Sequence, residues 1–398
     1  MIEIREEHVD EILADAHALA YPRYPGTDGD RRAIAWVEDK LHAAGLEVST
    51  EEFTYDIRPA FRALRTLTLA CAFLVGAAGL LAASAPKMAG LLLIAALVFA
   101  AFFLGWSPWM ERIYAGDGPT RTANVSGTRR VEKPRATVIL LAHHDSKSQN
   151  LTFPWRMGMT LLAILGTLTL VGLLITGAVT GAPVAPDWVP RVAGAVAAIA
   201  LIVLSTLKSG NLSPGGVDNA GSLAIVLQLA KLLPASGPDD VEWIFLSPGA
   251  EEDHMVGAMR WLDRHREELA GRPVWAINFD GAGNPGRVAL LERFGFGRAF
   301  SPTLSAVVRR CAAELGIAVR GVLMPPGMGI DAIPFAHRGI DCLTLSSGSL
   351  GRATSAIHSS GDVAENLDRA TLLEVARLAA ALVSAMADAG VQSGVGGR

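Results

Sequence analysis

The chain has 398 residues, which is enough for two or three domains or for one large α/β domain with insertions. The net charge is −4 and no long run of Lys and Arg occurs, so nucleic acid is excluded as a partner. Three cysteines without a CxxC spacing exclude a disulfide-rich fold. Hydrophobic residues make up 51% of the chain and charged residues only 19%, so part of the apolar sequence must be covered by lipid or by another protein.

The first segment of the chain predicts two helices and a strand. Apolar residues at helical spacing predict helices over 3–20 and 30–44, and Gly45 is a typical residue after a helix end. Residues 46–55 are expected to form a strand. The N-terminal residues are acidic and lack the basic and apolar regions of a secretory signal peptide, so we expect them to remain in the cytoplasm.

Four stretches almost without charge interrupt the polar sequence. They cover residues 66–85, 88–110, 157–186 and 192–207. A helix of about 20 residues crosses a hydrocarbon layer of roughly 30 Å, and the first three stretches reach that length. The fourth does so only when it is extended back to Trp188, with Arg191 at the interface. The pattern predicts four transmembrane helices in two hairpins, 61–110 and 157–207. A buried core helix is the alternative, chiefly for the fourth stretch.

Two hairpins cross a membrane an even number of times, so they leave all the polar sequence on one side. Basic residues are more frequent at that side than in the hairpin loops, which predicts a cytoplasmic polar domain by the positive-inside rule. The polar side has Arg58, Arg62, Arg65, Arg112, Arg156 and Lys208, and the loops have Lys87 and Arg191. The opposite orientation is the alternative, favoured by glycosylation sequons at Asn124, Asn150 and Asn211. With 29 Arg against 6 Lys, the composition is typical of a GC-rich bacterium, so the membrane is expected to be a bacterial plasma membrane.

The remaining residues, 1–60, 111–156 and 208–398, fit one α/β domain. After the first hairpin we expect strands at 120–126, 136–142, 241–246, 274–279, 319–323 and 342–345, and helices at 222–233, 257–269, 302–315 and 367–387. This alternation predicts a mixed, mainly parallel central sheet covered by helices on both faces. A GxxxG spacing at Gly177 and Gly181 permits helix association and leaves the oligomeric state unknown.

Histidine and acidic residues follow the expected strands, where ligands gather in such folds. They lie in HHDS at 143–146, GGVDNAGS at 215–222, the pair Glu251-Glu252, Asp280, and IHSSGD at 357–362. Two histidines and three or four carboxylates form a ligand set for two Zn²⁺ ions. In a pair of glutamates, one side chain can hold a metal while the other takes a proton from water. A carboxylate two residues after a ligand histidine, as Asp145 is after His143, can fix the histidine tautomer.

Together and in this order, the segments resemble the zinc aminopeptidases of metallopeptidase family M28, which also includes glutaminyl cyclases and transferrin-receptor-like proteins. The resemblance covers AHHDS, GGVDNAGS, GAEEDHMVGA, NFDGAG, IDAIPF and IHSSGD. It implies a zinc-exopeptidase fold with two Zn²⁺ ions as cofactors. By motif position, the implied metal ligands are His143 and Asp280 for one ion, Glu252 and His358 for the other, and Asp218 as the bridge. Glu251 would be the general base and then the acid, and Asp145 is the second catalytic residue because it would orient a ligand histidine.

The resemblance also indicates where the substrate would bind and what remains open. Asp331 and Phe335 lie in IDAIPF, which is similar to a family segment near the substrate amine, so both are expected to bind substrate. Family members often have a tyrosine beside the last histidine, where this chain has Ile357, so the group that stabilises the oxyanion is not identified. The four tyrosines of the chain are all far away in sequence.

The expected function is that of a membrane-anchored zinc aminopeptidase, a hydrolase that releases N-terminal residues from peptides. Its expected partners are the peptide substrate and membrane lipid. A glutaminyl cyclase is the nearest alternative, suggested by the sequence HHDSK, although no Trp follows Trp275. The sequence also leaves open a deacylase of a related di-zinc family and a non-catalytic membrane scaffold.

Overall fold

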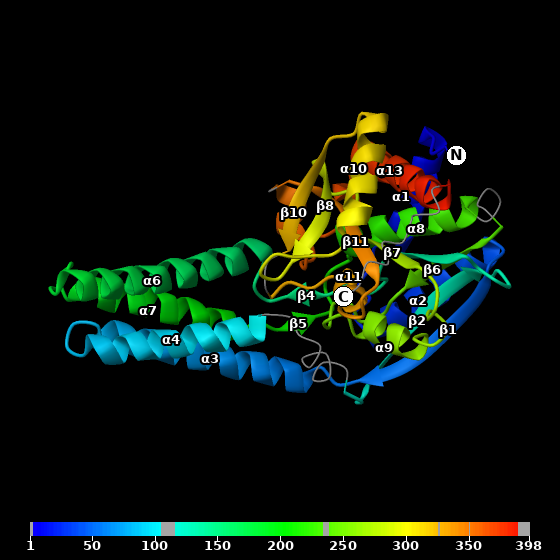
Figure 1. Cartoon of the computed structure of the whole chain (residues 1–398). Coiled ribbons are helices and arrows are strands. Elements are labelled where there is room, and N and C mark those ends of the chain that lie inside the picture. Colours follow the sequence, from blue (N-terminus) through cyan, green and yellow to red (C-terminus); the bar gives the residue numbers. More distant parts are fainter. Residues whose placement is uncertain (1–2, 105–115, 234–238, 325–326, 350, 389–398) are drawn as a thin grey trace. The chain divides into compact units, whose positions relative to one another are not determined.

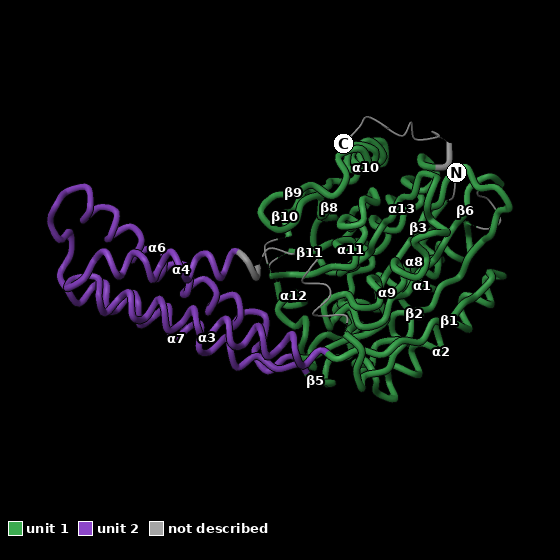
Figure 2. Tube along the Cα trace, turned by 60° about the horizontal axis from the view of Figure 1, so that its bottom comes forward, with its two compact units in different colours: residues 1–56, 107–148, 210–398 green, residues 57–106, 149–209 purple. Residues whose placement is uncertain are grey.

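The computed structural model of the protein describes residues 3–104, 116–233, 239–324, 327–349 and 351–388. The chain forms two compact units and passes between them four times (Figure 2). Unit 1 comprises residues 1–56, 107–148 and 210–398, and unit 2 comprises residues 57–106 and 149–209. A two-stranded sheet of β4 (Ser148–Gln149) and β5 (Ser209–Gly210) forms where the second insertion leaves and rejoins unit 1.

Unit 1 is built on one large sheet with the strand order β1-β2-β6-β3-β7-β11-β8-β10 and with β9 paired to β8 (Figure 1). The strands are β1 (Glu47–Tyr55), β2 (Thr120–Arg129), β3 (Ala136–Leu141), β6 (Val241–Ser247), β7 (Val274–Phe279), β8 (Arg287–Phe294), β9 (Arg298–Ala299), β10 (Val319–Met324) and β11 (Asp341–Gly348). The four central strands β6, β3, β7 and β11 are parallel to one another. Their carboxyl ends therefore lie at one edge of the sheet.

The sheet is mixed, and its parallel part is smaller than the sequence predicts. β2 joins β6 in antiparallel orientation, and β8 joins β11 in the same way, while β10 is parallel to β8. The expectation of a mainly parallel sheet therefore describes the centre, and antiparallel pairs join the strands on either side to it. Part of the difference comes from β8, a strand that the sequence analysis missed because Arg287, Glu292 and Arg293 flank its short apolar run.

Helices cover both faces of this sheet. One face carries α1 (Glu6–Leu19), α2 (Asp28–Ala43), α8 (Gly221–Leu232), α10 (Pro302–Leu315) and α13 (Arg369–Asp388), and the other carries α9 (Val256–Arg264) and α11 (Ala332–His337). Side chains of β3 alternate between the faces, so Val138 and Leu140 join the core of the first face while Ile139 and Leu141 are buried on the second. This strand is thus buried on both sides, as its uninterrupted apolar sequence predicts.

Local signals fix the ends of two of these helices, and of these signals the sequence analysis predicted Gly45. Thr27 accepts a hydrogen bond from the Asp30 amide at the start of α2, and Gly45 follows its end with a φ of 75°. Ser301 caps α10 in the same way, and Gly316 ends it with a φ of 70°. These caps fix where the chain turns back toward the sheet.

The first insertion interrupts a strand pair without disturbing it. Tyr55, the last residue of β1, is paired with Thr120, the first residue of β2. The Asp56 amide also donates to the Gly116 carbonyl, at 2.9 Å. Because the two ends of the insertion are already adjacent in unit 1, the segment between them can be long without an effect on the sheet.

In the part that the structure describes, unit 2 contains four helices, α3 (Arg58–Leu81), α4 (Pro86–Leu104), α6 (Phe153–Thr180) and α7 (Trp188–Leu204). In this unit α3 packs on α4 and α7, and α6 packs on α7 and α4. Among the described residues, α3 and α6 are long and apolar enough to cross a membrane, while the apolar parts of α4 and α7 are shorter. Both long helices begin before the expected hairpin limits at 61 and 157, because polar residues such as Arg58 and Arg156 continue the helix beyond its apolar part.

Small residues make the interior contacts of unit 2. A Cβ added to Gly194 of α7 would lie 2.9 Å from the Gly79 Cα of α3, and one added to Gly166 of α6 would lie 2.6 Å from the Ala193 carbonyl of α7. The GxxxG residues have other positions, since Gly181 ends α6 with a φ of 70° and Gly177 lies close only to the following turn. Close helix packing in this unit therefore depends on glycines that the GxxxG spacing did not indicate.

Candidate metal centre

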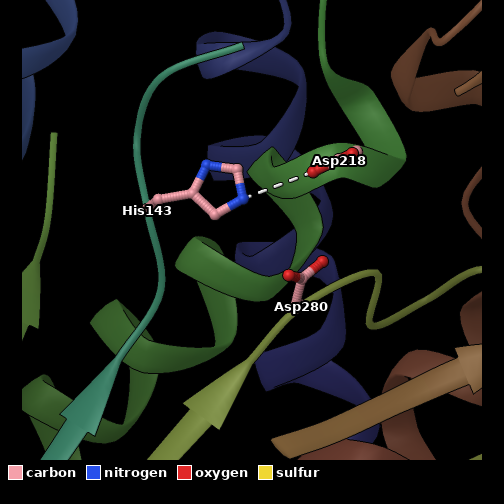
Figure 3. Close-up of side chains that lie close together, drawn as sticks. All are labelled: His143, Asp218 and Asp280. Carbon is pink, nitrogen blue, oxygen red and sulfur yellow. Dashed lines mark ion pairs between the residues drawn. The ribbon is translucent and has the colours of Figure 1, made fainter. Parts of the chain in front are cut away.

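Metal-ligand residue types gather at the carboxyl ends of the central strands. β3 leads into His143 and β7 leads into Asp280, and Figure 3 shows both side chains close to Asp218. β6 leads, through a short loop, into Glu251 and Glu252. Segments that are far apart in the sequence thus deliver their polar side chains to one place because the strands before them are parallel neighbours.

The first group consists of His143, Asp218 and Asp280, whose candidate ligand atoms lie within 4.8 Å of one another. His143 Nε2 is 3.3 Å from Asp218 Oδ1, as the dashed line in Figure 3 marks. That nitrogen is buried and has no hydrogen-bond partner among the described residues. His143 Nδ1 lies 3.2 Å from the backbone oxygen of Asp145, so a proton on Nδ1 leaves the Nε2 lone pair free for a metal.

The second group consists of Asp218, Glu252 and His358. Asp218 lies in η1 (Gly216–Ala220), directly before α8, and His358 follows α12 (Arg352–Ala356). His358 Nε2 is 3.2 Å from Asp218 Oδ2 and 3.1 Å from Glu252 Oε2. Asp218 therefore presents Oδ1 to the first group and Oδ2 to the second, which is the arrangement a bridging carboxylate requires.

The groups perturb one another because they are buried together. Burial raises the pKa of Asp280 to about 7, and the neighbouring Asp218 carboxylate acts in the same direction. Burial also acts to raise the pKa of Glu252, but His358 and Lys147 outweigh it and hold that pKa at about 2. So many carboxylates in one buried place need cations to stabilise them.

Glu251 and Asp145 lie beside the two groups. Glu251 Oε2 is 3.8 Å from His143 Nε2, and burial raises the pKa of Glu251 well above its usual value. The Asp145 carboxylate accepts hydrogen bonds from the backbone amides of Glu251 and Glu252, at 3.2 and 3.1 Å. Asp145 Oδ1 also lies 3.4 Å from His143 Nδ1. Asp145 thus contacts both the glutamate pair and His143.

Strained backbone is concentrated around these side chains. The described non-glycine residues with positive φ are Ala250, His254, Met255 and His358, with φ between 57° and 71°. Three of them flank the glutamate pair and the fourth belongs to the second group itself. Such conformations cost on the order of 1 kcal/mol or more each and cluster at functional sites.

A buried arginine that the sequence analysis did not single out connects the loops of the site. Arg23 is fully buried, and its guanidinium donates to the carbonyls of His144, Pro214 and Gly215. These carbonyls belong to the loops that carry His143 and Asp218. No local pattern could have revealed this role, since a single arginine has no characteristic spacing.

Two tyrosines lie close to the glutamate pair in space although they are distant in sequence. Tyr24 Oη and Tyr55 Oη both donate to the Asp253 carboxylate, at 2.9 and 2.7 Å. Burial raises the pKa of Asp253 to about 6, and the two hydroxyl groups act in the opposite direction. Both tyrosine hydroxyl groups thus bind the loop that follows Glu252.

The two residues expected to bind substrate differ in their surroundings. Asp331 is fully buried near the two groups, both its carboxylate oxygens lack a hydrogen-bond partner among the described residues, and burial raises its pKa to about 8. Phe335 lies in α11 and stacks on Trp261 of α9 at 6.4 Å between ring centroids. Phe335 is fully buried there, as Asp331 is, and its part in substrate binding stays a prediction.

The donor set fits zinc. Two imidazoles and three carboxylates are ligand types that Zn²⁺ takes in proteins, and the buried, unpartnered Nε2 of His143 points into the first group. The residues present are therefore suited to the cofactor that the resemblance implies.

The model of Peptidase family M28 matches residues 192–383. That range includes Asp218, the glutamate pair, Asp280 and His358, while His143 precedes it. No curated protein matches the chain.

Solved structures of aminopeptidases and of a glutaminyl cyclase have a similar fold. A zinc aminopeptidase from Bacillus subtilis is 14% identical over 97% of this chain and 96% of its own, with a TM-score of 0.56. An aminopeptidase from Aneurinibacillus sp. strain AM-1 is 12% identical over 96% of each chain, with a TM-score of 0.57. A glutaminyl cyclase from Fimbriiglobus ruber is 12% identical over 96% of this chain and 97% of its own, with a TM-score of 0.56. These likenesses establish a zinc-peptidase fold for the chain.

Proposed function

We propose that the protein is a membrane-anchored, di-zinc metallopeptidase that acts as an aminopeptidase on peptides. The observation that carries the proposal is the pair of ligand groups that share Asp218, with Glu251 beside them. His143 and Asp280 would hold one zinc ion, Glu252 and His358 the other, and Asp218 both. Bound there, the two ions would polarise the scissile carbonyl and lower the pKa of water from 15.7 toward roughly 7.

In this proposal Glu251 moves the proton. As the water oxygen bonds to the carbonyl carbon, Glu251 takes the water proton, and it delivers that proton to the nitrogen as the C–N bond breaks. Its position beside His143 and its nearly complete burial support this role, because both keep it next to the reacting atoms and away from bulk water. Asp145 is a positioning residue, since it holds the amides of the glutamate pair.

Asp331 supports cleavage at the amino end of a peptide. A buried carboxylate with two unpartnered oxygens is a costly feature unless a cation satisfies it, and the N-terminal ammonium of a peptide is such a cation. We propose that Asp331 binds this ammonium. An exopeptidase needs such a group because it must recognise a chain end rather than an internal peptide bond.

The exterior of unit 2 supports the membrane anchor. In the most apolar 18-residue stretch of α3 only 33% is buried, and in that of α6 only 17%. Large side chains such as Phe73 and Leu168 are exposed. We propose that all four helices span the bilayer, with unit 1 in the cytoplasm by the positive-inside rule. The sequon at Asn124 gives no support to the opposite orientation, because that side chain is buried and bonded to Gly249 and Gly257. Arg112, one of the basic residues of this argument, lies outside the described residues.

A glutaminyl cyclase is the second candidate, because solved glutaminyl cyclases share the fold. The deacylase alternative is less favoured. Enzymes of that kind carry a lid domain between the last two ligands, whereas the segment between Asp280 and His358 supplies strands β8, β10 and β11 of the central sheet.

The test is a comparison of the detergent-purified full chain with the Glu251→Gln variant. We expect about two zinc ions per chain in both proteins and turnover of peptides with free N-termini by the parent. The variant should lose roughly 10²- to 10⁴-fold in rate, because it keeps the shape of the side chain but cannot take a proton. Zinc and rate are measured on the same preparations, with N-terminal Gln included in the substrate panel.

Three outcomes contradict the proposal in different ways. Cyclisation of N-terminal Gln without peptide hydrolysis would favour the second candidate. Zinc without turnover of any of these substrates would favour a deacylase or a scaffold. Absence of zinc would overturn the site itself.

A further inference from the structure

Lys147 makes three contacts with one side of the second group. Its backbone amide donates to Glu252 Oε1 at 3.1 Å, and its Nζ lies 2.9 Å from Glu252 Oε2. The same Nζ donates to the Glu252 backbone oxygen at 2.7 Å. Both carboxylate oxygens of Glu252 are therefore engaged by a single residue, and Oε2 is the atom that also faces His358.

The first group has no corresponding cation. Its carboxylate, Asp280, follows β7 directly, and no hydrogen bond or ion pair reaches its side chain among the described residues. The two groups share Asp218 and differ in whether their other carboxylate, Asp280 or Glu252, is paired with a cationic side chain. Glu252 of the second group is paired with the Lys147 ammonium, whereas Asp280 of the first group has no such pair among the described residues.

The ammonium of Lys147 is also held in place without Glu252 Oε2. Its bond to the Glu252 backbone oxygen does not depend on the carboxylate, and only 15% of its side chain is exposed. When a metal takes Oε2, the ammonium remains within a few ångströms as a fixed positive charge. Two cations at such a distance repel each other strongly in a buried environment.

We propose that Lys147 is a positioning residue that holds the Glu252 carboxylate and makes the second group the weaker of two unequal zinc sites. The first group fills first and tightly. The second group fills only when a metal displaces the Lys147 ammonium from Oε2. This inference rests on the proposed function, because it assumes that both groups take zinc.

The experiment is a Zn²⁺ titration of the metal-stripped full chain in detergent, followed by calorimetry and by competition with a chelator. The parent is expected to bind zinc in two phases of different affinity. In Lys147→Gln the weak phase should tighten by roughly 10- to 100-fold, since a buried charge repulsion is removed, while the tight phase should stay unchanged. An unchanged or weakened second phase in Lys147→Gln would overturn the inference.

Matched variants assign the phases and separate charge from shape. His358→Ala should remove the weak phase and Asp280→Asn the tight one. Lys147→Arg keeps the charge and should remain close to the parent, so tightening in this variant would contradict the inference. Lys231→Gln removes the same charge from an exposed pair with Glu11 and should leave both phases unchanged. A parent chain that binds no zinc would overturn the proposed function, whereas two phases that do not respond to Lys147→Gln would overturn only this inference.

Discussion

The two units of the molecule pack their side chains in opposite ways. Unit 1 buries its largest side chains, among them Trp243, Phe245 and Phe279, and its sheet is covered on both faces. Unit 2 buries small residues such as Ala78 and Gly79 and exposes large ones such as Phe73, which is 73% exposed. Large apolar side chains thus fill the interior of unit 1, whereas in unit 2 only a few of them are buried and many lie on the exterior.

The surroundings of each unit explain this difference in packing. In water, burial of large apolar side chains is the main driving force, at about 25 cal/mol per Å². In lipid that force is absent between helices, and close packing through small residues takes its place. Unit 1 therefore has the packing of a protein domain in water, and unit 2 has the packing expected of helices whose outer surface meets hydrocarbon.

A charge placed at an exposed leucine of each unit should have the largest difference in effect. Leu168 of α6 is 59% exposed and Leu315 of α10 is 42% exposed. If unit 2 meets lipid, Leu168→Arg should cost about 2.5 to 3.5 kcal/mol of insertion free energy, because the guanidinium enters the middle of a span. Leu315→Arg should change stability by less than about 0.5 kcal/mol, because that position meets water.

The measurement is the amount of each variant in carbonate-washed membranes, with thermal unfolding in detergent as a second readout. A clear loss for Leu168→Arg together with parent-like behaviour of Leu315→Arg supports the lipid-facing surface. Equal and small effects at both positions would mean that unit 2 also lies in water.

Much of unit 1 can be predicted from sequence because its signals are local. Strand β7 and helix α10 have the expected bounds, since an apolar run and a Ser-Pro cap define them within a few residues. β8 escapes prediction because charged residues near both its ends hide its apolar pattern. Its pairing with β11 joins segments that are distant in sequence, so no local sequence pattern indicates it.

The residues of the candidate site also differ in whether the sequence alone could indicate them. His143 and Asp280 are predictable because each closely follows a strand, so the fold alone brings them to one edge. Arg23 and Tyr55 are not, because their partners are carbonyls and a carboxylate more than a hundred residues away. The position of a residue that directly follows a strand is set by that strand, whereas the contacts of a residue between loops are set only by the complete tertiary structure.

A smaller effect is expected when the glycines of unit 2 are replaced. Gly194 of α7 has no room for a side chain, since an added Cβ would lie 2.9 Å from the Gly79 Cα. Gly172 of α6 has open space around it and serves as the matched control. We expect Gly194→Leu to cost about 1 to 3 kcal/mol through overpacking, and Gly172→Leu to be nearly neutral. Thermal unfolding in detergent measures both, and similar midpoints for the two variants would contradict close packing through small residues.

The smallest expected effect concerns a polar network of a kind that helps unit 1 face water. His265 Nε2 lies 2.6 Å from Glu51 Oε1, and Nδ1 lies 2.8 Å from Glu268 Oε2. The hydrogen bond to Glu51 raises the pKa of His265 above its usual value of 6.5, against the effect of burial. Because the folded pKa is the higher one, the stabilisation is fully present below about pH 6.5 and is lost as the pH rises through the raised value. Between about pH 6 and pH 9, the parent should therefore lose about 1 kcal/mol more stability than His265→Gln, while His42→Gln, at an exposed position, should follow the parent. Parallel curves for parent and His265→Gln in thermal unfolding would show that this network contributes nothing to the pH dependence of stability.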